Sequence, residues 1–199
     1  MVSVARIGYI LSVAPGRRSC GHSNSKLKAG TLPVLVYDRF ATTFGQVTVV
    51  KSDRGVCYIG LPGSALFQAK DWAARHFPGE SWNRAPGQFE EERREVQAYS
   101  QGLGRQFTFP LDHRNSPFSL RVLAAVSRVP YGQTVTYQSI ARQVGRSGAA
   151  RAVGRAVATN PLPLIIPCHR IVGTNGSLTG YGGGLELKRA LLQMESSQL

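Results

Sequence analysis

Short runs of β-branched and aromatic residues alternate with turn residues in the first half of the chain, beginning near Leu32. Four such runs predict strands, at residues 34–37, 45–50, 56–59 and 107–111. The first three predict a meander, with turns at Asp38 and at residues 52–55. Helical spacing of apolar residues predicts two helices, over residues 65–77 and 89–101. Together these elements predict an α/β unit over residues 33–112.

No residue pattern in this first unit predicts catalysis. Cys57 lies in the middle of a predicted strand, where a cysteine is more often a small buried hydrophobe than a nucleophile. The charged run at residues 90–95 is expected to be a solvated face of its helix.

The pattern changes to short helices from Pro117 onward. Apolar spacing predicts three of them, over residues 118–128, 137–144 and 148–158. Thr136 and Ser147 are expected to be the N-caps of the second and third helices. A tight turn at residues 145–147, followed by an Ala-rich basic helix, is typical of a helix-turn-helix protein that reads DNA.

The third of these helices has two different faces. Its core face is expected to hold Ala149, Val153, Ala156 and Val157. The other face holds Arg151 and Arg155, whose like charges lie four residues apart and cost an isolated helix about 0.2–0.5 kcal/mol. Either both arginines are simply solvated, or they bind nucleic-acid phosphates, which relieves the repulsion. The small residues Ala150 and Gly154 favour the second interpretation, because they let a groove come close to the helix.

The charge balance adds to this picture. Lys and Arg number 24 against 11 Asp and Glu among the 199 residues, a formal net charge of +13. Residues 1–34 contribute +5 and residues 115–199 contribute +7, so the middle of the chain adds only +1. This balance predicts a polyanionic partner, a nucleic acid first and an anionic membrane second. No apolar run approaches the roughly 18 residues of a membrane-spanning helix. Three cysteines cannot form a disulfide framework and favour a reduced compartment.

Residues 1–32 differ from the rest of the chain, because they are basic, free of acidic residues and partly Ser/Gly-rich. Three interpretations stay open: a basic disordered extension, an organelle transit peptide, and a start codon assigned too far upstream. The composition favours the first and third over targeting. Cys20 and His22 lie here, and a lone Cys-x-His is a weak indication of a metal site.

One polar cluster follows the most apolar run of the second half. Residues 162–167 lead into Cys168, His169 and Arg170. Either Cys168 is a buried structural cysteine beside a surface His-Arg pair, or it is a nucleophile. In the second case the positive field lowers its pKa below the usual value of about 8.5, and His169 takes its proton directly or through water. Glu195 is a candidate to orient His169, because an acid at the C-terminal end of a helix opposes the helix dipole and needs a local reason.

A glycine run lies between this cluster and the last predicted helix. A turn at residues 174–177 is followed by the sequence Gly180-Tyr181-Gly182-Gly183-Gly184. Glycines let the backbone come close to a flat ligand. Tyr181 is the one aromatic side chain among them, and it could stack on such a ligand or donate its hydroxyl.

The block Ile166–Ile171 is similar to the active-site signature of the O6-alkylguanine-DNA alkyltransferases, also called methylated-DNA–protein-cysteine methyltransferases. The similarity runs without a gap from about Pro130 to Glu195. It includes the motifs Pro130-Tyr131-Gly132-Gln133-Thr134, Tyr137, Ala150-Arg151-Ala152-Val153-Gly154, Asn160-Pro161, Gly180-Tyr181-Gly182-Gly183-Gly184 and Leu191-Leu192-x-x-Glu195. Residues 33–112 resemble the family's N-terminal domain only loosely, and residues 1–32 have no counterpart.

The resemblance implies an α/β (α+β) fold with a ribonuclease-H-like domain over residues 33–112 and a helical, winged-helix-like catalytic domain over residues 116–199. It implies a DNA repair protein that flips O6-alkylguanine, and O4-alkylthymine, out of duplex DNA and moves the alkyl group irreversibly to Cys168. No cofactor is implied, because the DNA itself donates the alkyl group. The expected partner is double-stranded DNA containing alkylated guanine, and no membrane. The chain is expected to be a monomer, cytoplasmic in a prokaryote or nuclear in a eukaryote, with organelle targeting by residues 1–32 as the alternative.

The resemblance also implies roles for single residues. Glu195 holds His169, which draws the proton from Cys168 through a water. Tyr181 donates a proton to the leaving guanine, and Arg170 has a structural role. The implied DNA contacts are Tyr137, Ala149, Ala150, Arg151, Ala152, Gly154 and Arg155, with Arg151 inserted where the flipped base was. The implied pocket and structural residues are Val157, Asn160, Pro167, Gly182, Gly183 and Gly184, with Asn160 bracing the turn before the active-site strand.

The sequence departs from the family pattern at a few positions. Residues 116–119 replace a Thr-x-Phe-Gln run and Leu123 replaces a common Trp, both of which indicate packing differences. Arg155 stands where many members have a small residue. The zinc ligands of some members are not recognisable as a set, since Cys57 and His113 are the only candidates, and no structural zinc is predicted.

Two other classes of function compete with repair. A DNA-binding module of the alkyltransferase-like branch recognises alkylated bases without reacting, but its cysteine is replaced, whereas Cys168 is present here. A thiol hydrolase or peptidase with a Cys-His-Glu triad would have Cys168 and His169 awkwardly adjacent in sequence, and it would leave the basic third helix unexplained.

Overall fold

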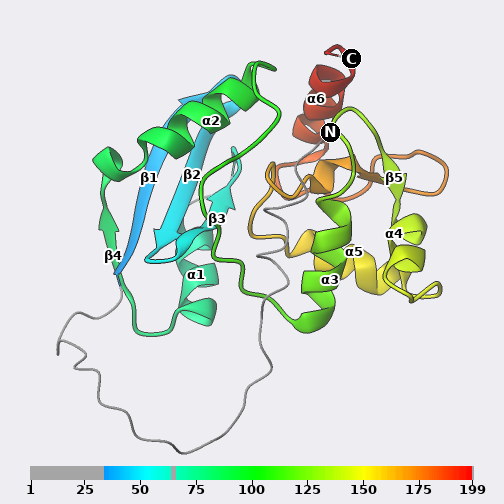
Figure 1. Cartoon of the computed structure of the whole chain (residues 1–199), viewed down its shortest axis with the longest axis horizontal. Coiled ribbons are helices and arrows are strands. Elements are labelled where there is room, and N and C mark those ends of the chain that lie inside the picture. Colours follow the sequence, from blue (N-terminus) through cyan, green and yellow to red (C-terminus); the bar gives the residue numbers. More distant parts are fainter. Residues whose placement is uncertain (1–33, 64–65, 199) are drawn as a thin grey trace, which may run out of the picture.

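The computed structural model describes residues 34–63 and 66–198, and the predicted extension over residues 1–32 lies outside them. Figure 1 shows a sheet with two helices beside a group of short helices that includes the C-terminal helix. The protein therefore has a mixed α/β fold, with the strands concentrated in the first half and the helices in the second, as the apolar spacing predicts.

The sheet has four strands in the order β3-β2-β1-β4. They are β1 (Val34–Thr42), β2 (Gly45–Ser52), β3 (Gly55–Gly60) and β4 (Ser81–Arg84). The first three form the predicted antiparallel meander, and β4 pairs in parallel with β1 at the edge. The sequence did not predict β4, because its four residues are mostly polar and exposed and so have no apolar alternation.

The prediction of a turn at Asp38 is wrong, because β1 continues through it and turns only after Thr42. Asp38 is fully buried within the strand. Its carboxylate lies 2.5 Å from a guanidinium nitrogen of Arg93 and 3.5 Å from one of Arg84. These two cations compensate the buried charge of Asp38. Because both arginines are distant in sequence, the local pattern around Asp38 does not reveal this pairing.

The prediction of a closing strand at residues 107–111 is also wrong. This segment makes a single parallel bridge, between Val56 and Leu111. The amide of Val56 donates to the carbonyl of Pro110 at 2.8 Å, and the amide of Asp112 donates to the carbonyl of Val56 at 2.9 Å. Pro110 has no N–H with which to extend this pairing into a ladder.

Two helices cover opposite faces of the sheet, as the alternation of its side chains requires. They are α1 (Leu66–His76) and α2 (Glu90–Ser100), and both confirm predicted helices. Leu35, Val50 and Cys57 pack with Trp72 of α1. A second cluster lies on the other face, where Val47, Val49, Val56 and Ile59 pack with Phe89, Val96 and Tyr99 of the α2 segment. A short 3₁₀ turn, η2 (Pro86–Gln88), precedes α2.

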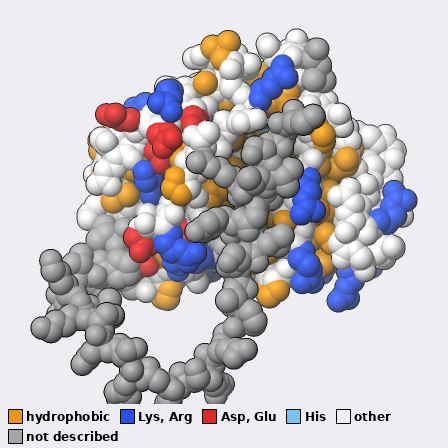
Figure 2. All heavy atoms as spheres, in the orientation of Figure 1, with side chains coloured by type: hydrophobic (Ala, Val, Ile, Leu, Met, Phe, Trp, Pro, Cys, Tyr) orange, Lys and Arg blue, Asp and Glu red, His pale blue; other side chains and the backbone are white. Residues whose placement is uncertain are grey.

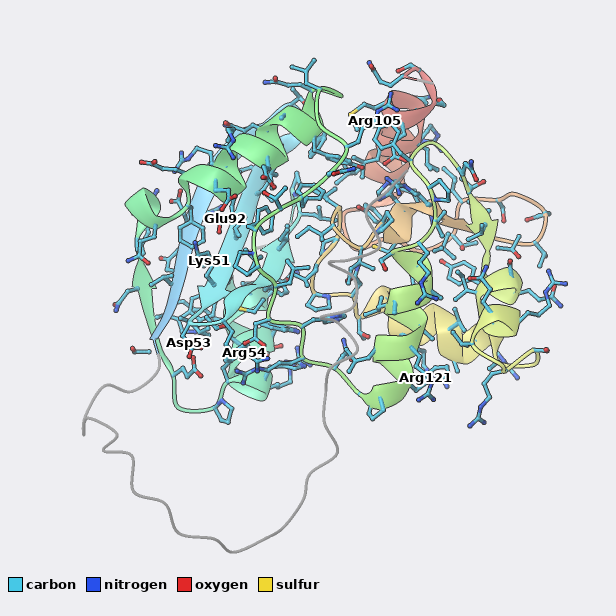
Figure 3. All side chains as sticks on the ribbon, viewed as in Figure 1. Lys51, Asp53, Arg54, Glu92, Arg105 and Arg121 are labelled. Atoms are coloured by element: carbon cyan, nitrogen blue, oxygen red, sulfur yellow. The ribbon has the colours of Figure 1, made fainter. Side chains whose placement is uncertain are left out.

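The charged run on α2 is not entirely a solvated face. Glu92 is 3% exposed, and its carboxylate lies 2.8 Å from the ammonium of Lys51 on β2. Figure 3 shows these two side chains between the helix and the sheet. Lys51 also donates to the carbonyl of Gln88 at 2.7 Å. This pair fixes α2 over the sheet, so the prediction of a solvated run fails at Glu92.

The second half contains four helices and one small parallel pair of strands among the described residues. The helices are α3 (Pro117–Val126), α4 (Tyr137–Gln143), α5 (Ala150–Ala158) and α6 (Leu185–Ser196). The strands are β5 (Val135–Thr136) and β6 (Ile171–Val172). Thr136 is the N-cap of α4, as predicted, and accepts from the Ser139 amide at 3.1 Å. Ser147 is not the N-cap of α5; that position is Ala149, which makes no capping hydrogen bond through its side chain.

The apolar core is continuous between the two halves. One cluster of buried side chains reaches from Val47 of the sheet through Tyr99 of α2 to Leu191 of α6. This packing brings the C-terminal end of α2 beside α6 (Figure 1). No helix in the described residues is long and apolar enough to cross a membrane.

Candidate active site

The polar cluster at residues 168–170 forms a single 3₁₀ turn, η3 (Cys168–Arg170), between Pro167 and β6. All three of its side chains are buried. An apolar run precedes the turn and a buried two-residue strand follows it, so the turn lies within the core. The alternative of a surface His-Arg pair is therefore wrong.

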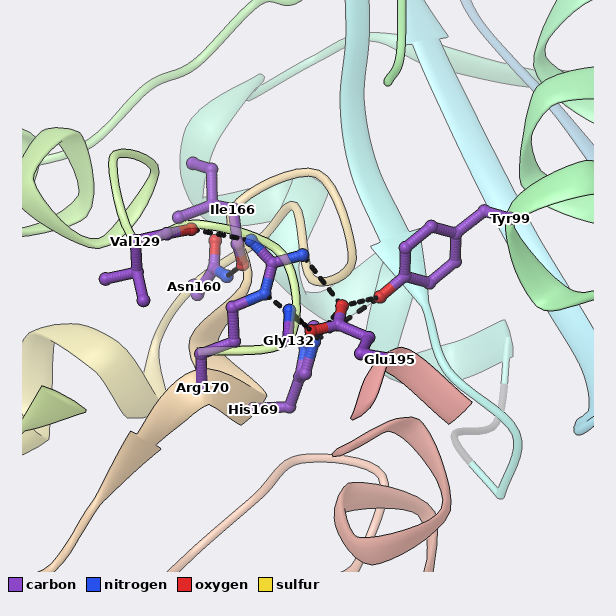
Figure 4. A network of polar contacts seen from close by, with 8 residues as sticks. All are labelled: Tyr99, Val129, Gly132, Asn160, Ile166, His169, Arg170 and Glu195. Carbon is purple, nitrogen blue, oxygen red and sulfur yellow. Dashed lines mark hydrogen bonds and ion pairs between the residues drawn. The ribbon is translucent and has the colours of Figure 1, made fainter. Parts of the chain in front are cut away.

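Glu195 is the centre of a buried polar network (Figure 4). His169 Nε2 lies 3.0 Å from its Oε1. The Arg170 guanidinium donates to both oxygens, at 2.7 Å and 2.9 Å, and the Gly132 amide donates to Oε2 at 3.0 Å. Arg170 also donates to the Val129 carbonyl at 2.6 Å. Arg170 thus makes the ion pair and hydrogen bonds of a structural residue.

These contacts are the local reason for an acid near the end of α6. Burial alone would raise the pKa of Glu195, but hydrogen bonds from His169 and Arg170 hold that pKa well below its usual range. Glu195 is therefore ionised, and two positive or hydrogen-donating neighbours offset the unfavourable helix dipole.

The surroundings of His169 determine which ring nitrogen carries the proton. Nε2 faces the ionised carboxylate of Glu195, so Nε2 must be the donor. Nδ1 is buried and has no hydrogen-bond partner among the described residues. Burial lowers the pKa of His169, although Glu195 opposes this, so the ring is neutral at rest. A neutral imidazole with its lone pair on Nδ1 has the form that a general base needs, and Glu195 holds it in one orientation.

Cys168 differs from expectation in its acidity. Burial raises the pKa of its thiol above the ordinary value, so the prediction of a lowered pKa is wrong. The prediction took the positive field from His169 and Arg170, but Arg170 pairs with Glu195, and burial favours the neutral form of His169. The side chain of Asn160 and the ammonium of Lys188 do favour the thiolate, but they do not outweigh burial. The thiol is thus protonated at rest and needs a base when it reacts.

Asn160 closes the loop that leads to Cys168. Its Nδ2 donates to the Ile166 carbonyl at 2.9 Å, and its Oδ1 accepts from the Leu162 amide at 3.1 Å. Between these two contacts, Leu164 has a φ of 75°, which a leucine rarely adopts. Asn160 thereby holds a strained loop in place, and the same side chain lies at the Cys168 thiol.

Sequence reasoning missed two residues of the site, Lys188 and Tyr99. Lys188 is fully buried on α6 and donates to the carbonyls of Ile171, at 2.6 Å, and Thr179, at 2.8 Å. It lies seven residues before Glu195 on the apolar face of the helix, and a lysine in an apolar stripe is a signal that could have found it. Tyr99 comes from α2 and gave no local signal.

Tyr181 lies over the imidazole of His169. The two rings meet edge to face, with centroids 6.3 Å apart. The Tyr181 hydroxyl is buried and finds no partner in residues 34–63 and 66–198, so it can donate to a ligand. Gly183 lies nearby in a close-packed place: a Cβ there would come within 2.6 Å of a terminal methyl of Leu187, which would have to move. Gly182 and Gly184 are exposed at the same bend.

A groove runs along α5 next to the site. Its lining comes from α4, α5 and the loops beside them: Tyr137, Gln138, Ser147, Gly148, Ala150, Arg151, Gly154, Thr174, Thr179 and Gly180. Tyr137 lies at ordinary van der Waals distance from where a side chain at Gly154 would begin. The helix buries its predicted core face at Val153, Ala156 and Val157. Ala149 and Ala152 are half-buried.

Several arginines of this half are exposed and make no ion pair among the described residues: Arg121, Arg128, Arg142, Arg146, Arg151 and Arg155. Figure 2 shows Lys and Arg over both halves of one face, whereas Asp and Glu gather over the N-terminal half. Arg121 on α3 is one of these exposed arginines (Figure 3). The second half therefore presents unneutralised positive charge around its groove.

In the part of the chain that the structure describes, no three His, Cys, Asp or Glu side chains lie close enough together to hold a metal ion. Cys57 is buried in β3, where burial raises the pKa of its thiol to about 12. This confirms Cys57 as a buried small side chain rather than a nucleophile. Cys20 and His22 lie outside the described residues.

A buried thiol, a histidine oriented by a carboxylate and a basic groove beside them form the kind of site that nucleophilic chemistry next to a polyanion requires. The family model described as "6-O-methylguanine DNA methyltransferase, DNA binding domain" matches residues 117–197. The inducible methylated-DNA–protein-cysteine methyltransferase of Bacillus subtilis strain 168 is 37% identical over 142 residues, 71% of this chain and 79% of that protein. The Mycobacterium tuberculosis H37Rv methyltransferase is 47% identical over 117 residues, 59% of this chain and 71% of that protein.

A solved structure gives the same result for the fold. The crystal structure of Mycobacterium tuberculosis OGT in complex with DNA has a TM-score of 0.72 and 36% sequence identity, and covers 82% of this chain and 94% of that chain. The chain belongs to the methylated-DNA–protein-cysteine methyltransferase family.

Proposed function

We propose that this protein repairs DNA by moving the alkyl group of O6-alkylguanine, and of O4-alkylthymine, irreversibly onto Cys168. The observation that carries the proposal is the buried Cys168 followed directly by His169, whose ring is held by ionised Glu195. The names of the family members identify methylated DNA as the donor and a protein cysteine as the acceptor. DNA is the partner, and the free arginines around the groove support it.

The transfer follows from the protonation states of the site. His169 Nδ1 takes the proton of the Cys168 thiol, through a water. The thiolate attacks the alkyl carbon, the C–S bond forms, and the carbon–oxygen bond to O6 of the guanine breaks. Tyr181 donates a proton to the departing guanine, for which its unpartnered hydroxyl is available. The thioether is not hydrolysed, so each chain acts once and needs no cofactor.

The groove and α5 are assigned to DNA binding. In this proposal α5 enters the minor groove and Arg151 fills the gap left by the flipped base. Tyr137 crowds the flanking phosphate and helps to turn the nucleotide out. Flipping costs a few kcal/mol, and less for a poorly paired damaged base, so it contributes to selectivity. Ala150 and Gly154 line the same groove and leave room for the DNA backbone.

The finer description of the fold belongs to this proposal. Residues 33–112 form a ribonuclease-H-like domain, supported by a meander followed by a parallel edge strand. Residues 116–199 form a winged-helix-like catalytic domain, supported by the short turn between α4 and α5. The chain acts as a monomer in the cytoplasm of a prokaryote or the nucleus of a eukaryote, with residues 1–32 as a basic extension.

The proposed function predicts one alkyl group per chain, on Cys168 alone. We expect the protein, after incubation with an O6-methylguanine duplex, to gain the mass of one methylene group, because a methyl replaces the thiol hydrogen. Intact mass spectrometry and peptide mapping measure this. Cys57 is the internal control, because its buried thiol should stay unmodified. Label on Cys57, or several turnovers per chain, would contradict the mechanism.

Arg151 is predicted to matter for duplex DNA and not for a free base. Arg151→Ala should slow repair of a methylated duplex by about tenfold or more, because the energy of base flipping is no longer offset. Its reaction with free O6-benzylguanine should keep nearly the parent rate. Single-turnover rates on both substrates measure the difference.

Arg155 is the matched control on the same helix, since it is exposed and does not line the groove. Arg155→Ala should weaken binding to all DNA sequences alike and change the salt slope by about 0.9, the effect of one phosphate contact. If Arg151→Ala slows both substrates equally, Arg151 supports the fold or the pocket and the assignment to base flipping is wrong.

A further inference from the structure

The hydroxyl of Tyr99 enters the active-site network from the other half of the chain. Tyr99 lies at the end of α2 and is 2% exposed. Its Oη donates to Glu195 Oε1 at 2.6 Å and lies 3.3 Å from His169 Nε2 (Figure 4). Its two hydrogen-bonding partners, His169 and Glu195, are 70 and 96 positions away in sequence, and Tyr99 lies outside residues 117–197, which the family model matches.

We propose that Tyr99 is a positioning residue for alkyl transfer, which acts through Glu195 to fix the orientation and proton affinity of His169. The inference rests on the proposed function. Tyr99 does not reach Cys168 by any hydrogen bond of the described residues; its contacts are with the carboxylate and the imidazole.

Three features hold the Tyr99 hydroxyl in place. Its ring packs against Phe107, with centroids 5.4 Å apart, and meets Tyr131 edge to face at 6.4 Å. Its helix is fixed over the sheet by the buried Phe89 and Val96. The hydroxyl therefore cannot swing away from Glu195, and the N-terminal sheet sets the position of an atom in the site.

Glu195 Oε1 accepts hydrogen bonds from three donors, so a change at one donor affects the other two. The three donors are the Tyr99 hydroxyl, His169 Nε2 and one Arg170 nitrogen. Each hydrogen bond to an ionised oxygen takes up part of its charge. The Tyr99 bond is the shortest of the three, so it withdraws charge that the carboxylate would otherwise direct at His169.

Removing the hydroxyl should therefore leave His169 more basic. The weaker 3.3 Å contact between Tyr99 Oη and His169 Nε2 acts in the opposite direction, but the shorter, charge-assisted bond to Glu195 outweighs it. The other titratable or charged groups that face His169 and Glu195 stay in place: Arg170 on η3, Lys188 on α6, Cys168, Tyr131 and Tyr181.

The test is Tyr99→Phe in the full chain, which keeps the ring and loses only the hydroxyl. Single-turnover methylation of Cys168 is measured as a function of pH. The rate should fall about threefold to tenfold, and the acidic midpoint of the profile should rise by about half a pH unit to one unit, the effect of one hydrogen bond. A structural role alone would lower the rate without moving the midpoint.

Tyr131→Phe is the matched control. It is the same substitution on the adjacent ring, and the Tyr131 hydroxyl has no partner among residues that the structure describes. Its midpoint should equal that of the parent. A second variant carries 3-fluorotyrosine at position 99, and it also serves as the test if Tyr99→Phe does not fold: this phenol is a stronger hydrogen-bond donor of nearly the same shape, and the midpoint should fall.

The outcomes separate this inference from the proposed function. A parent protein that gains no methyl group on Cys168 overturns the function and the inference together. A methylated parent whose midpoint does not move in Tyr99→Phe overturns the role of Tyr99 alone, and so does an unchanged midpoint with 3-fluorotyrosine. Opposite shifts in the two variants support it.

Discussion

His169→Ala is expected to slow methyl transfer to Cys168 by about 10²–10⁴-fold, while the affinity for duplex DNA stays at the parent level. The reason is the raised pKa of the buried thiol: Cys168 is protonated at rest and loses its proton only when a base accepts it. His169 Nδ1 can do so, because it is buried and has no hydrogen-bond partner within the described part of the chain. Single-turnover rates at saturating protein and a DNA-binding titration measure the two quantities.

The role of His169 as the base also predicts how the transfer rate of the parent protein changes with pH. Because burial lowers the pKa of His169 below its ordinary 6.5, the neutral base persists below that pH. The rate should therefore hold through pH 6.5 and fall only at lower pH, when His169 takes up a proton. In His169→Ala this acidic limb should be absent.

His76→Ala is the control for loss of an imidazole, since His76 is on α1, with its Nδ1 at 2.8 Å from the Trp72 carbonyl, away from the site. It should react at the parent rate. An unchanged rate in His169→Ala would leave His169 without a catalytic role, and the proton of Cys168 would have to leave by another route.

Local patterns in the sequence predicted the elements whose signals are local. The meander, α1, α2 and the short helices of the second half follow from apolar spacing and from turn residues. The sequence did not predict β4, because a short polar edge strand is recognised only by its pairing with β1. The prediction of a turn at Asp38 was wrong for a related reason: the charge of Asp38 is compensated by Arg84 and Arg93, which lie 46 and 55 residues away.

In the active site, too, the features with a local sequence signal were predicted and those that depend on contacts between distant residues were not. The block at residues 168–170 was visible in the sequence because it is contiguous and chemically distinctive. The acidity of Cys168 was not, because it depends on burial and on whether Arg170 faces the thiol or Glu195. Tyr99 could not be found locally, because its contact with Glu195 spans 96 residues and depends on how α2 packs beside α6.

Glu195→Gln is expected to lower the free energy of unfolding by about 3–5 kcal/mol at neutral pH, because it leaves the buried Arg170 guanidinium without its counter-charge. The amide of the glutamine also turns a donor toward groups that are themselves donors, Arg170, His169 and the Gly132 amide. Chemical denaturation followed by circular dichroism measures the loss. Glu186→Gln is the matched control on the same helix, since Glu186 is exposed and pairs with exposed Arg189, and the stability of this variant should equal that of the parent.

The difference between the parent and Glu195→Gln should depend on pH in one direction. The pKa of Glu195 in the folded protein is lowered from an ordinary value of 4.5, so its contribution to stability is complete above about pH 4.5 and is lost as the pH falls toward the folded value. The two proteins should thus differ by a constant amount from pH 7 to about pH 5 and converge in more acidic solution. A difference that is as large at pH 3 as at pH 7 would show that the loss comes from packing rather than from the charge, and Glu195 would then not be the ionised partner that holds His169 and Arg170.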